Sequence, residues 1–216
     1  MGKTCLITGA SQGIGRAAAI RMAREPGVSA IVLVARNAEG LAETRAAMDV
    51  HEDTTVKLIP YDLGGLDGIP DLVRDVHDEF GSIDLLLNIA GYAEPKSLLD
   101  TSAENLVRTF TINVFAMLLL TREFVRYMQG RPAKVLNVAS TAGITSRPGW
   151  VAYAASKAAV VSLLANPRRR ARPGRASRST ASRPGARPQN SGASSRRRRT
   201  PARSCSRATS RRSSRP

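Results

Sequence analysis

The apolar residues of this chain gather into five short runs, which alternate with longer segments of mixed polarity. Each run is six or seven residues long. A run of this length between turn residues is typical of a strand that is buried on both faces. We therefore predict strands at Lys3–Thr8, Ala30–Ala35, Val56–Tyr61, Ile83–Asn88 and Ala133–Ala139.

The segments between these runs have the composition or the apolar spacing of helices. They predict helices at Arg16–Glu25, Asn37–Val50, Ile69–Phe80, Ser102–Met128 and Trp150–Ala165. Strands that alternate with helices indicate a parallel sheet with helices on both of its faces. We predict an α/β fold with a doubly wound parallel sheet.

The charge of the chain is distributed very unevenly, although the net value of +16 by itself resembles that of a nucleic-acid-binding protein. Residues 1–166 hold 16 Lys and Arg and 17 Asp and Glu, whereas residues 167–216 hold 17 Arg and no acidic residue. The second segment also lacks Val, Ile, Leu, Met, Phe, Tyr and Trp. Because it cannot bury apolar surface to offset the entropy of ordering, we predict a domain over 1–165 and a disordered tail over 166–216.

The remaining composition excludes several classes of protein. Two cysteines, Cys5 in an apolar run and Cys205 in the tail, predict no disulfide framework. No apolar run reaches membrane-spanning length and the N-terminus lacks the shape of a signal peptide, so we expect a cytoplasmic protein without a membrane partner. His51 and His77 lie in polar stretches, and we expect neither to bind a metal.

A cluster of three glycines follows the first predicted strand directly and precedes a predicted helix. Gly9, Gly13 and Gly15 would permit a tight turn and a close approach of the backbone to a diphosphate. The free N–H groups at the start of the helix would then face the phosphates. The alternative is an ordinary strand-to-helix turn.

A second group of residues carries candidate chemistry, namely Ser140, Tyr153 and Lys157. If the last predicted helix forms, Tyr153 and Lys157 lie one turn apart on the same face. An ammonium beside a phenol favours the phenolate and lowers the pKa of the phenol, which makes it usable in acid–base chemistry near neutral pH. The hydroxyl of Ser140 could hold a carbonyl oxygen against that phenol.

These motifs occur together with several others in one order along the chain. They are Thr8-Gly9 to Gly15 in the pattern TGxxxGxG, Asp62-Leu63, Asn88-Ile-Ala-Gly91, Asn113, Ser140, and Tyr153-x-x-x-Lys157. Over residues 3 to 165 the sequence thereby resembles the short-chain dehydrogenase/reductase family, whose fold is of the Rossmann type. Two positions depart from the family pattern: Ile89 stands where a second Asn is common, and Ala139 stands before the catalytic serine.

The resemblance implies a role for each matching residue. The cofactor site would comprise the phosphate turn, the adenine contacts and the sheet edge beside the ribose, namely Gly9, Ser11, Gly13, Ile14, Gly15, Asp62, Leu63, Asn88, Ala90 and Gly91. At the catalytic site, Asn113 would position a water that links Lys157 to solvent, and Ser140 would orient the substrate carbonyl. Tyr153 would transfer the proton, and Lys157 would bind the nicotinamide ribose.

The end of the second predicted strand bears on the choice of cofactor. An acidic residue there would accept hydrogen bonds from a ribose 2′-hydroxyl and repel a 2′-phosphate. This chain has Ala35 and then Arg36, and a guanidinium suits a phosphate. We therefore expect Arg36 to contact the cofactor and expect NADP(H) rather than NAD(H). The alternative is a solvated arginine at the start of a loop.

The family pattern continues beyond Lys157 with a sixth strand, a Pro-Gly turn, a substrate lid and usually a seventh strand. None of these is found, and Pro167 would break the last helix. We therefore expect a fold truncated after the fifth strand and its helix. If the codons over Arg175–Ser182 are read in a shifted frame, the genetic code permits the sequence pattern G-[IV]-x-V-N-x-V, which is close to the sixth-strand pattern of the family. One hypothesis is therefore that the tail is an out-of-frame translation of a family member's C-terminal third, which the coding DNA would test.

The sequence as a whole predicts an NADP(H)-dependent oxidoreductase that interconverts a carbonyl and an alcohol. We expect a poorly active and marginally stable chain, and its association into homo-oligomers stays open. The alternative is an inactive cofactor-binding remnant whose Arg-rich tail binds nucleic acid through phosphates, without reading sequence because the tail has no aromatic residues.

Overall fold

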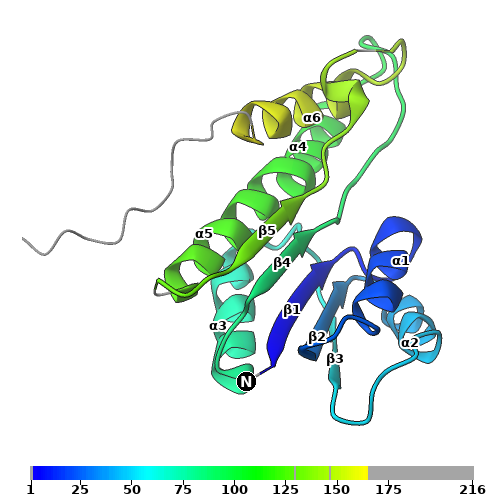
Figure 1. Cartoon of the computed structure of the whole chain (residues 1–216). Coiled ribbons are helices and arrows are strands. Elements are labelled where there is room, and N and C mark those ends of the chain that lie inside the picture. Colours follow the sequence, from blue (N-terminus) through cyan, green and yellow to red (C-terminus); the bar gives the residue numbers. More distant parts are fainter. Residues whose placement is uncertain (1, 129, 146, 165–216) are drawn as a thin grey trace, which may run out of the picture. The chain divides into compact units, whose positions relative to one another are not determined.

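The computed structural model describes residues 2–128, 130–145 and 147–164, so the predicted tail and the frame-shift hypothesis lie outside the described residues (Figure 1). The described chain forms one parallel sheet in the order β3-β2-β1-β4-β5. Its strands are β1 (Lys3–Thr8), β2 (Val28–Ala35), β3 (Thr55–Pro60), β4 (Leu85–Asn88) and β5 (Lys134–Asn137). The order reverses between β1 and β4, which confirms the doubly wound α/β fold.

Helices cover both faces of this sheet. They are α1 (Gly13–Met22), α2 (Ala38–Ala46), α3 (Ile69–Phe80), α4 (Ala103–Phe110), α5 (Met117–Met128) and α6 (Val151–Leu164), with short elements η1 (Leu66–Gly68), η2 (Thr111–Ala116) and η3 (Thr141–Gly143). Figure 1 shows α1 and α2 together beside β1 to β3, and α3 and α5 together on the other face. This arrangement buries the strands on both sides, as their continuous apolar runs predict.

The side chains of β1 point alternately to the two faces of the sheet and so contribute to two hydrophobic cores. Cys5 and Ile7 pack with the side chains of α1 and α2, whereas Leu6 packs with those of α3 and α5. Successive residues of a strand point to opposite faces, so a fully apolar strand supplies both cores. Burial raises the pKa of the Cys5 thiol to about 12, which keeps the thiol protonated and suits a core residue.

Local signals explain where several helices begin and end. The side chain of Asn37 accepts a hydrogen bond of 3.1 Å from the Gly40 amide at the start of α2, and Ser102 accepts one of 3.1 Å from the Asn105 amide at the start of α4. Gly81, with φ of 73°, ends α3 in the left-handed conformation. Both kinds of signal are visible in the sequence.

The long helix at Ala103–Met128 differs from its prediction in two ways. A π-helical segment, η2, interrupts it between α4 and α5. The helix is also, by length and composition alone, apolar enough to cross a membrane, although polar residues interrupt its apolar runs. Of its apolar window, 44% is buried inside the fold, and a core helix meets the same criterion.

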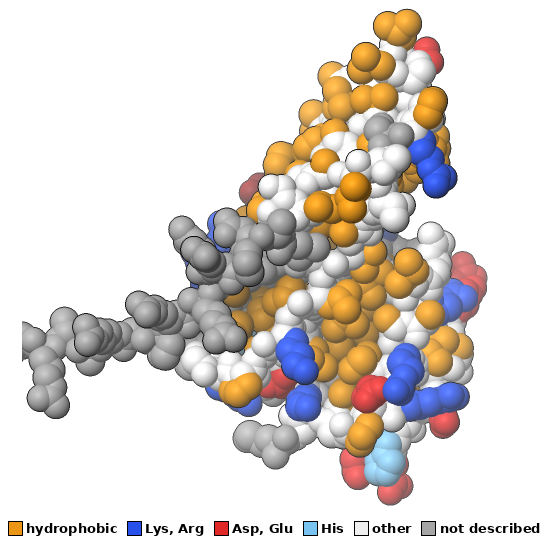
Figure 2. Space-filling model, turned by 45° about the horizontal axis from the view of Figure 1, so that its top comes forward, with side chains coloured by type: hydrophobic (Ala, Val, Ile, Leu, Met, Phe, Trp, Pro, Cys, Tyr) orange, Lys and Arg blue, Asp and Glu red, His pale blue; other side chains and the backbone are white. Residues whose placement is uncertain are grey.

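Apolar side chains also remain at the surface of the described residues. Figure 2 shows hydrophobic side chains over the upper part of the view, where α4, α6 and the neighbouring loops lie. Leu98, Leu99 and Ile144 are each at least 70% exposed, and Val107 and Phe115 on the long helix are 65% and 46% exposed.

Candidate functional site

A cavity of about 670 Å³ lies at the carboxyl ends of the strands. In a doubly wound sheet this edge, at the point where the strand order reverses, is where ligands bind. The cavity brings together most of the residues predicted for the site: Gly9, Ser11, Gly13, Ile14, Gly15, Arg36, Asp62, Leu63, Ala90, Gly91, Tyr153 and Lys157. The predicted residues Asn88, Asn113 and Ser140 lie outside its lining.

Two glycines of the turn between β1 and α1 are required by close packing of the backbone. A Cβ on Gly9, whose φ is 70°, would lie 2.7 Å from the Cα of Ala90. A Cβ on Gly15 would lie 2.0 Å from the carbonyl oxygen of Gly9. Both distances are far shorter than a van der Waals contact, so the turn keeps its shape only with glycine at these positions. The resulting turn leads into the N-terminus of α1, which is a suitable anion-binding geometry.

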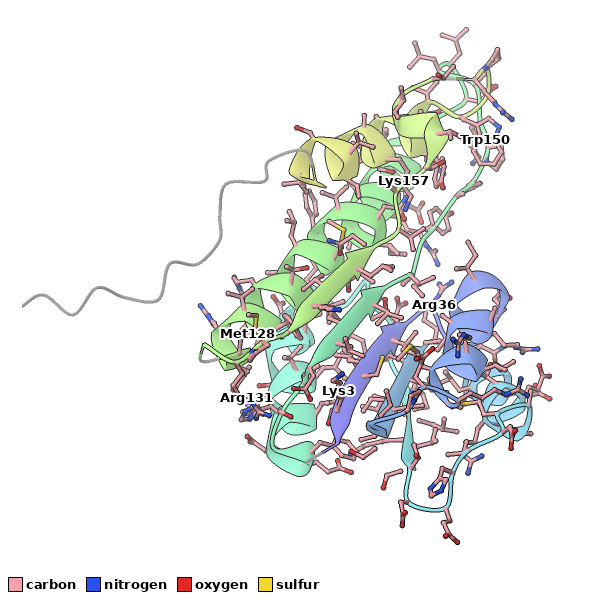
Figure 3. The ribbon with its side chains drawn as sticks, in the orientation of Figure 1. Lys3, Arg36, Met128, Arg131, Trp150 and Lys157 are labelled. Atoms are coloured by element: carbon pink, nitrogen blue, oxygen red, sulfur yellow. The ribbon has the colours of Figure 1, made fainter. Side chains whose placement is uncertain are left out.

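Arg36 follows β2 directly and lines the cavity with an exposed side chain. Among the described residues, no carboxylate forms an ion pair with its guanidinium. Figure 3 shows Arg36 beyond the strand ends near α1, and Lys157 on α6. A cation is therefore present at the end of β2, where the cofactor prediction requires one.

Tyr153 and Lys157 lie one turn apart on α6 and face the same cavity. The Nζ atom of Lys157 lies 5.7 Å from the centroid of the Tyr153 ring. It donates a hydrogen bond of 2.9 Å to the carbonyl oxygen of Val138, and the side chain is 5% exposed. Burial lowers the pKa of Lys157 below its usual value of 10.5. The ammonium therefore lies beside the Tyr153 ring on the same side of α6.

The buried ammonium predicts a dependence of stability on pH. Because the pKa of Lys157 is lower in the folded than in the unfolded protein, the unfolded protein binds more protons between the folded pKa and 10.5. The free energy of unfolding of the unliganded wild type should therefore rise with pH across that window, relative to Lys157→Met. Urea denaturation of both proteins at a series of alkaline pH values measures this difference. A difference that stays constant across the window would contradict the prediction.

Asn113 joins the cavity-lining segment at Tyr92 to α6 through hydrogen bonds, and Asn113 itself is not part of the cavity lining. Its Oδ1 atom accepts a hydrogen bond of 2.7 Å from the Tyr92 amide, and its Nδ2 atom donates to the Tyr92 carbonyl at 2.9 Å. The same Nδ2 atom donates to the hydroxyl of Ser156 at 2.9 Å. The side chain, in the π-helical segment η2, thus joins α6 to the segment around Tyr92. Its predicted role in positioning a water stays a prediction.

Ser140 and Asn88 also use their side chains for local structure. The Ser140 hydroxyl oxygen accepts a hydrogen bond of 3.1 Å from the Ala142 amide and caps η3. The Nδ2 atom of Asn88 donates to Asn137 at 2.8 Å and to Thr121 at 3.2 Å, so it joins β4 to β5 and α5. The bond to Ser140 does not use the proton of its hydroxyl.

Several residues of the cavity lining were not assigned to the site from the sequence: Gln12, Ala35, Asn37, Tyr61, Ile89, Tyr92, Ala93, Ile112 and Val138. Most follow a strand end, and the rule that ligands bind at this edge could have included them. Val138 contributes through its backbone carbonyl, for which the sequence carries no signal. Trp150 packs edge-to-face against Tyr153, with ring centroids 5.5 Å apart, and lies outside the lining.

The described residues contain one group with the spacing of metal ligands, and it includes His51, which we did not expect to bind a metal. His51, Glu52 and Asp53 are consecutive and exposed, and their ligand atoms lie within 4.8 Å of one another. They precede β3 and so lie at the opposite end of the sheet from the cavity. No second feature of the structure points to an ion there.

Comparisons with known proteins agree with this geometry. A family model described as short chain dehydrogenase matches residues 3–177. The chain is 34% identical over 163 residues to the uncharacterized oxidoreductase YhdF of Bacillus subtilis, covering 75% of this chain and 55% of that protein. It is 32% identical over 161 residues to the NADP-dependent 3-hydroxy acid dehydrogenase of Schizosaccharomyces pombe, covering 74% of this chain and 62% of that protein. The chain thus spans less than two thirds of the length of either relative.

Solved structures show the same similarity. The crystal structure of an NAD⁺-bound xylitol dehydrogenase has a TM-score of 0.68 and 33% identity, and the match covers 75% of this chain and 62% of that one. A short-chain dehydrogenase from Streptomyces avermitilis has a TM-score of 0.67 and 32% identity, with 76% and 58% coverage. Relatives of this chain therefore include proteins described with NADP and with NAD⁺.

Proposed function

The chain belongs to the short-chain dehydrogenase family, and from that premise we propose that it is an NADP(H)-dependent oxidoreductase that interconverts a carbonyl and an alcohol. One observation carries the proposal. The glycine turn after β1 and the Tyr153–Lys157 pair on α6 line the same cavity, although more than 130 residues separate them in the sequence. A dinucleotide bound along the strand ends would reach from the turn to the phenol.

The residues present fit such a cofactor. Gly9 and Gly15 keep the turn packed against backbone atoms, and at Gly13, which lines the cavity, an added Cβ would meet no atom within 4 Å, so the turn leaves open space for a diphosphate near the start of α1. Lys157 uses one N–H on Val138 and retains two for ribose hydroxyls. When bound, the nicotinamide supplies or accepts the hydride at the substrate carbon.

The protein's own groups would handle the proton and the orientation of the substrate. Ser140 accepts a hydrogen bond from the Ala142 amide, so its O–H can donate to the substrate oxygen. The Tyr153 hydroxyl then gives its proton to that oxygen in reduction and takes it back in oxidation. The Lys157 ammonium beside the Tyr153 ring stabilises the phenolate that remains after the proton leaves.

The preference for NADP(H) is supported by Arg36. We expect Arg36→Leu to weaken NADPH binding about 10-fold or more, because a charge-assisted hydrogen bond to a phosphate is lost. Binding of NADH should change by less than about 3-fold, since NADH lacks the 2′-phosphate. Quenching of protein fluorescence on titration with each cofactor measures both dissociation constants.

A matched control for this prediction is Arg45→Leu, which removes an exposed arginine from the last turn of the neighbouring helix α2. That variant should bind both cofactors as the wild type does. An Arg36→Leu protein that loses affinity for NADPH and NADH equally would refute selectivity through the 2′-phosphate, and a wild type that prefers NADH would refute the choice of NADP(H).

The reaction itself is tested by following NADPH oxidation with a panel of ketones and aldehydes. Turnover that depends on both NADPH and a carbonyl compound supports the enzyme. Two of the proteins named above are described with different substrates, a 3-hydroxy acid and xylitol, so we propose no substrate beyond a small-molecule carbonyl or alcohol. Cytoplasmic location, and association of copies through the exposed apolar side chains of α4 and α5, remain proposals of the same kind.

A second candidate function rests on the charge of residues 167–216. Their 17 Arg without an acidic residue would attract the phosphates of RNA or DNA. In that case the chain is a cofactor-binding remnant that binds NADPH without turnover. Its affinity for RNA would fall steeply with salt and would disappear on removal of 167–216. RNA binding that is absent at low salt excludes this candidate.

A further inference from the structure

Arg16 joins the glycine turn to helix α2. Its Nη2 atom donates a hydrogen bond of 2.7 Å to the carbonyl oxygen of Ser11 in the turn. The same atom lies 2.6 Å from the Oε2 atom of Glu43, and Nε donates to the Thr44 hydroxyl at 3.1 Å. Although Arg16 belongs to α1, its polar contacts are therefore made to the turn and to α2.

Thr44 makes the second bond between α2 and the turn. Its buried hydroxyl donates to the carbonyl oxygen of Ala10 at 2.9 Å and lies 2.8 Å from the carbonyl oxygen of Gly40. The two elements also pack closely, because a Cβ on Gly40 would lie 3.0 Å from the Ser11 carbonyl oxygen. We call Arg16 and Thr44, with the carbonyls of Ala10 and Ser11 that they hold, the turn clamp.

The turn clamp fixes two successive peptide planes. In a trans peptide the C=O and the following N–H point in opposite directions. The Ala10 and Ser11 carbonyls are held toward α2, so the amides of Ser11 and Gln12 point away from it. Both residues line the cavity, and neither amide has a hydrogen-bond acceptor among the described residues. Successive N–H groups on one side of a turn form an anion-binding concavity.

We propose that Arg16 and Thr44 are positioning residues, which turn the Ser11 and Gln12 amides toward the diphosphate of a bound dinucleotide. The inference rests on the proposed function, because it requires a dinucleotide in this cavity. It adds a source of affinity that depends on side chains outside the cavity lining. Glu43 pairs with Arg16, so the Arg16 charge is offset and its contribution is orientation of the turn.

The test compares ligands with and without a diphosphate in the full-length chain. We expect Arg16→Met to raise the dissociation constants of NADPH and ADP-ribose about 10-fold, since well-oriented amide donors are lost. Ligand-observed NMR should give an unchanged affinity for adenosine, which has no phosphate. With NADPH as substrate, KM should rise by a similar factor, and kcat at saturation should stay within about 2-fold of the wild type.

Matched variants separate positioning from a general loss of structure. Arg21→Met changes the same residue type on the same helix, where Arg21 forms an ion pair with Glu25, and should leave the affinities unchanged. Thr44→Val should weaken ADP-ribose binding and Thr44→Ser should restore it. If Arg16→Met does not fold, the Thr44 pair decides the question.

The outcomes distinguish this inference from the function on which it rests. A wild-type chain that binds neither NADPH nor ADP-ribose would overturn the proposed function, and the role of the clamp with it. The role of the clamp alone would be overturned if the wild type binds ADP-ribose and folded Arg16→Met binds it with unchanged affinity. If Arg16→Met does not fold, unchanged ADP-ribose affinity in Thr44→Val would have the same consequence. Equal losses for adenosine and ADP-ribose would also overturn it.

Discussion

Tyr153→Phe should lower the turnover of a carbonyl substrate by about 1000-fold, because the variant keeps the ring and loses only the proton that general acid catalysis requires. The dissociation constant of NADPH should change by less than about 2-fold, since the edge-to-face contact with Trp150 and the neighbouring Lys157 are retained. The measurement is steady-state oxidation of NADPH at saturating ketone, together with a separate NADPH titration.

The control for Tyr153→Phe is Tyr127→Phe. Tyr127 lies on α5, stacks on His77 at 4.6 Å between ring centroids, and is outside the cavity lining. It should retain wild-type turnover. A Tyr153→Phe protein with more than a tenth of the wild-type turnover would contradict the assignment of the phenol as the proton donor.

Gly15→Ala should weaken NADPH binding by about 100-fold or more. The added Cβ would lie 2.0 Å from the Gly9 carbonyl oxygen, so the turn or the start of α1 must shift. Either shift moves the amides that we propose to face the diphosphate. We also expect a lower melting temperature, because the displaced atoms are backbone atoms in a buried part of the fold. NADPH titration and thermal unfolding followed by circular dichroism measure the two effects.

Gly81→Ala provides the comparison for Gly15→Ala. Gly81 ends α3 with φ of 73°, and an added Cβ meets no atom within 4 Å. The change should cost about 1 kcal/mol of stability through backbone strain and leave the affinity for NADPH unchanged. If Gly15→Ala behaved like Gly81→Ala in both measurements, the close packing of the turn would not be needed for binding.

The elements of the fold were predictable where a local pattern is strong. The bounds of β1 and α3 agree with their predictions, because an apolar run before a glycine and a regular amphipathic spacing leave little freedom. The predicted Asn37–Val50 helix ends at Ala46 instead. The π-helical segment η2 has no local signal, since it accompanies tertiary hydrogen bonds that Asn113 donates to the Tyr92 carbonyl and to the Ser156 hydroxyl.

The candidate site was predictable mainly because the carboxyl ends of parallel strands share one edge. That rule places Gly9, Arg36, Asp62 and Ala90, from four different segments, around one cavity. Residues that act through backbone groups were not predictable in the same way. The sequence shows Arg16 as one more arginine on a helix, and only the fold brings it to the Ser11 carbonyl.

Side-chain assignments were the least predictable part of the site. Asn88 and Asn113 come from the family resemblance, yet both use their amides to join secondary-structure elements. An amide has donors and an acceptor on one short side chain, so its partners depend on the tertiary packing. The sequence pattern therefore identifies such residues without giving their contacts.

A crystal structure of the chain with NADPH bound tests the central claim most directly. The account predicts the diphosphate against the start of α1, the 2′-phosphate within hydrogen-bond distance of Arg36, and the nicotinamide beside the hydroxyl of Tyr153 with Lys157 on its ribose. A diphosphate bound away from the Gly9–Gly15 turn, or a nicotinamide out of contact with Tyr153, would contradict it.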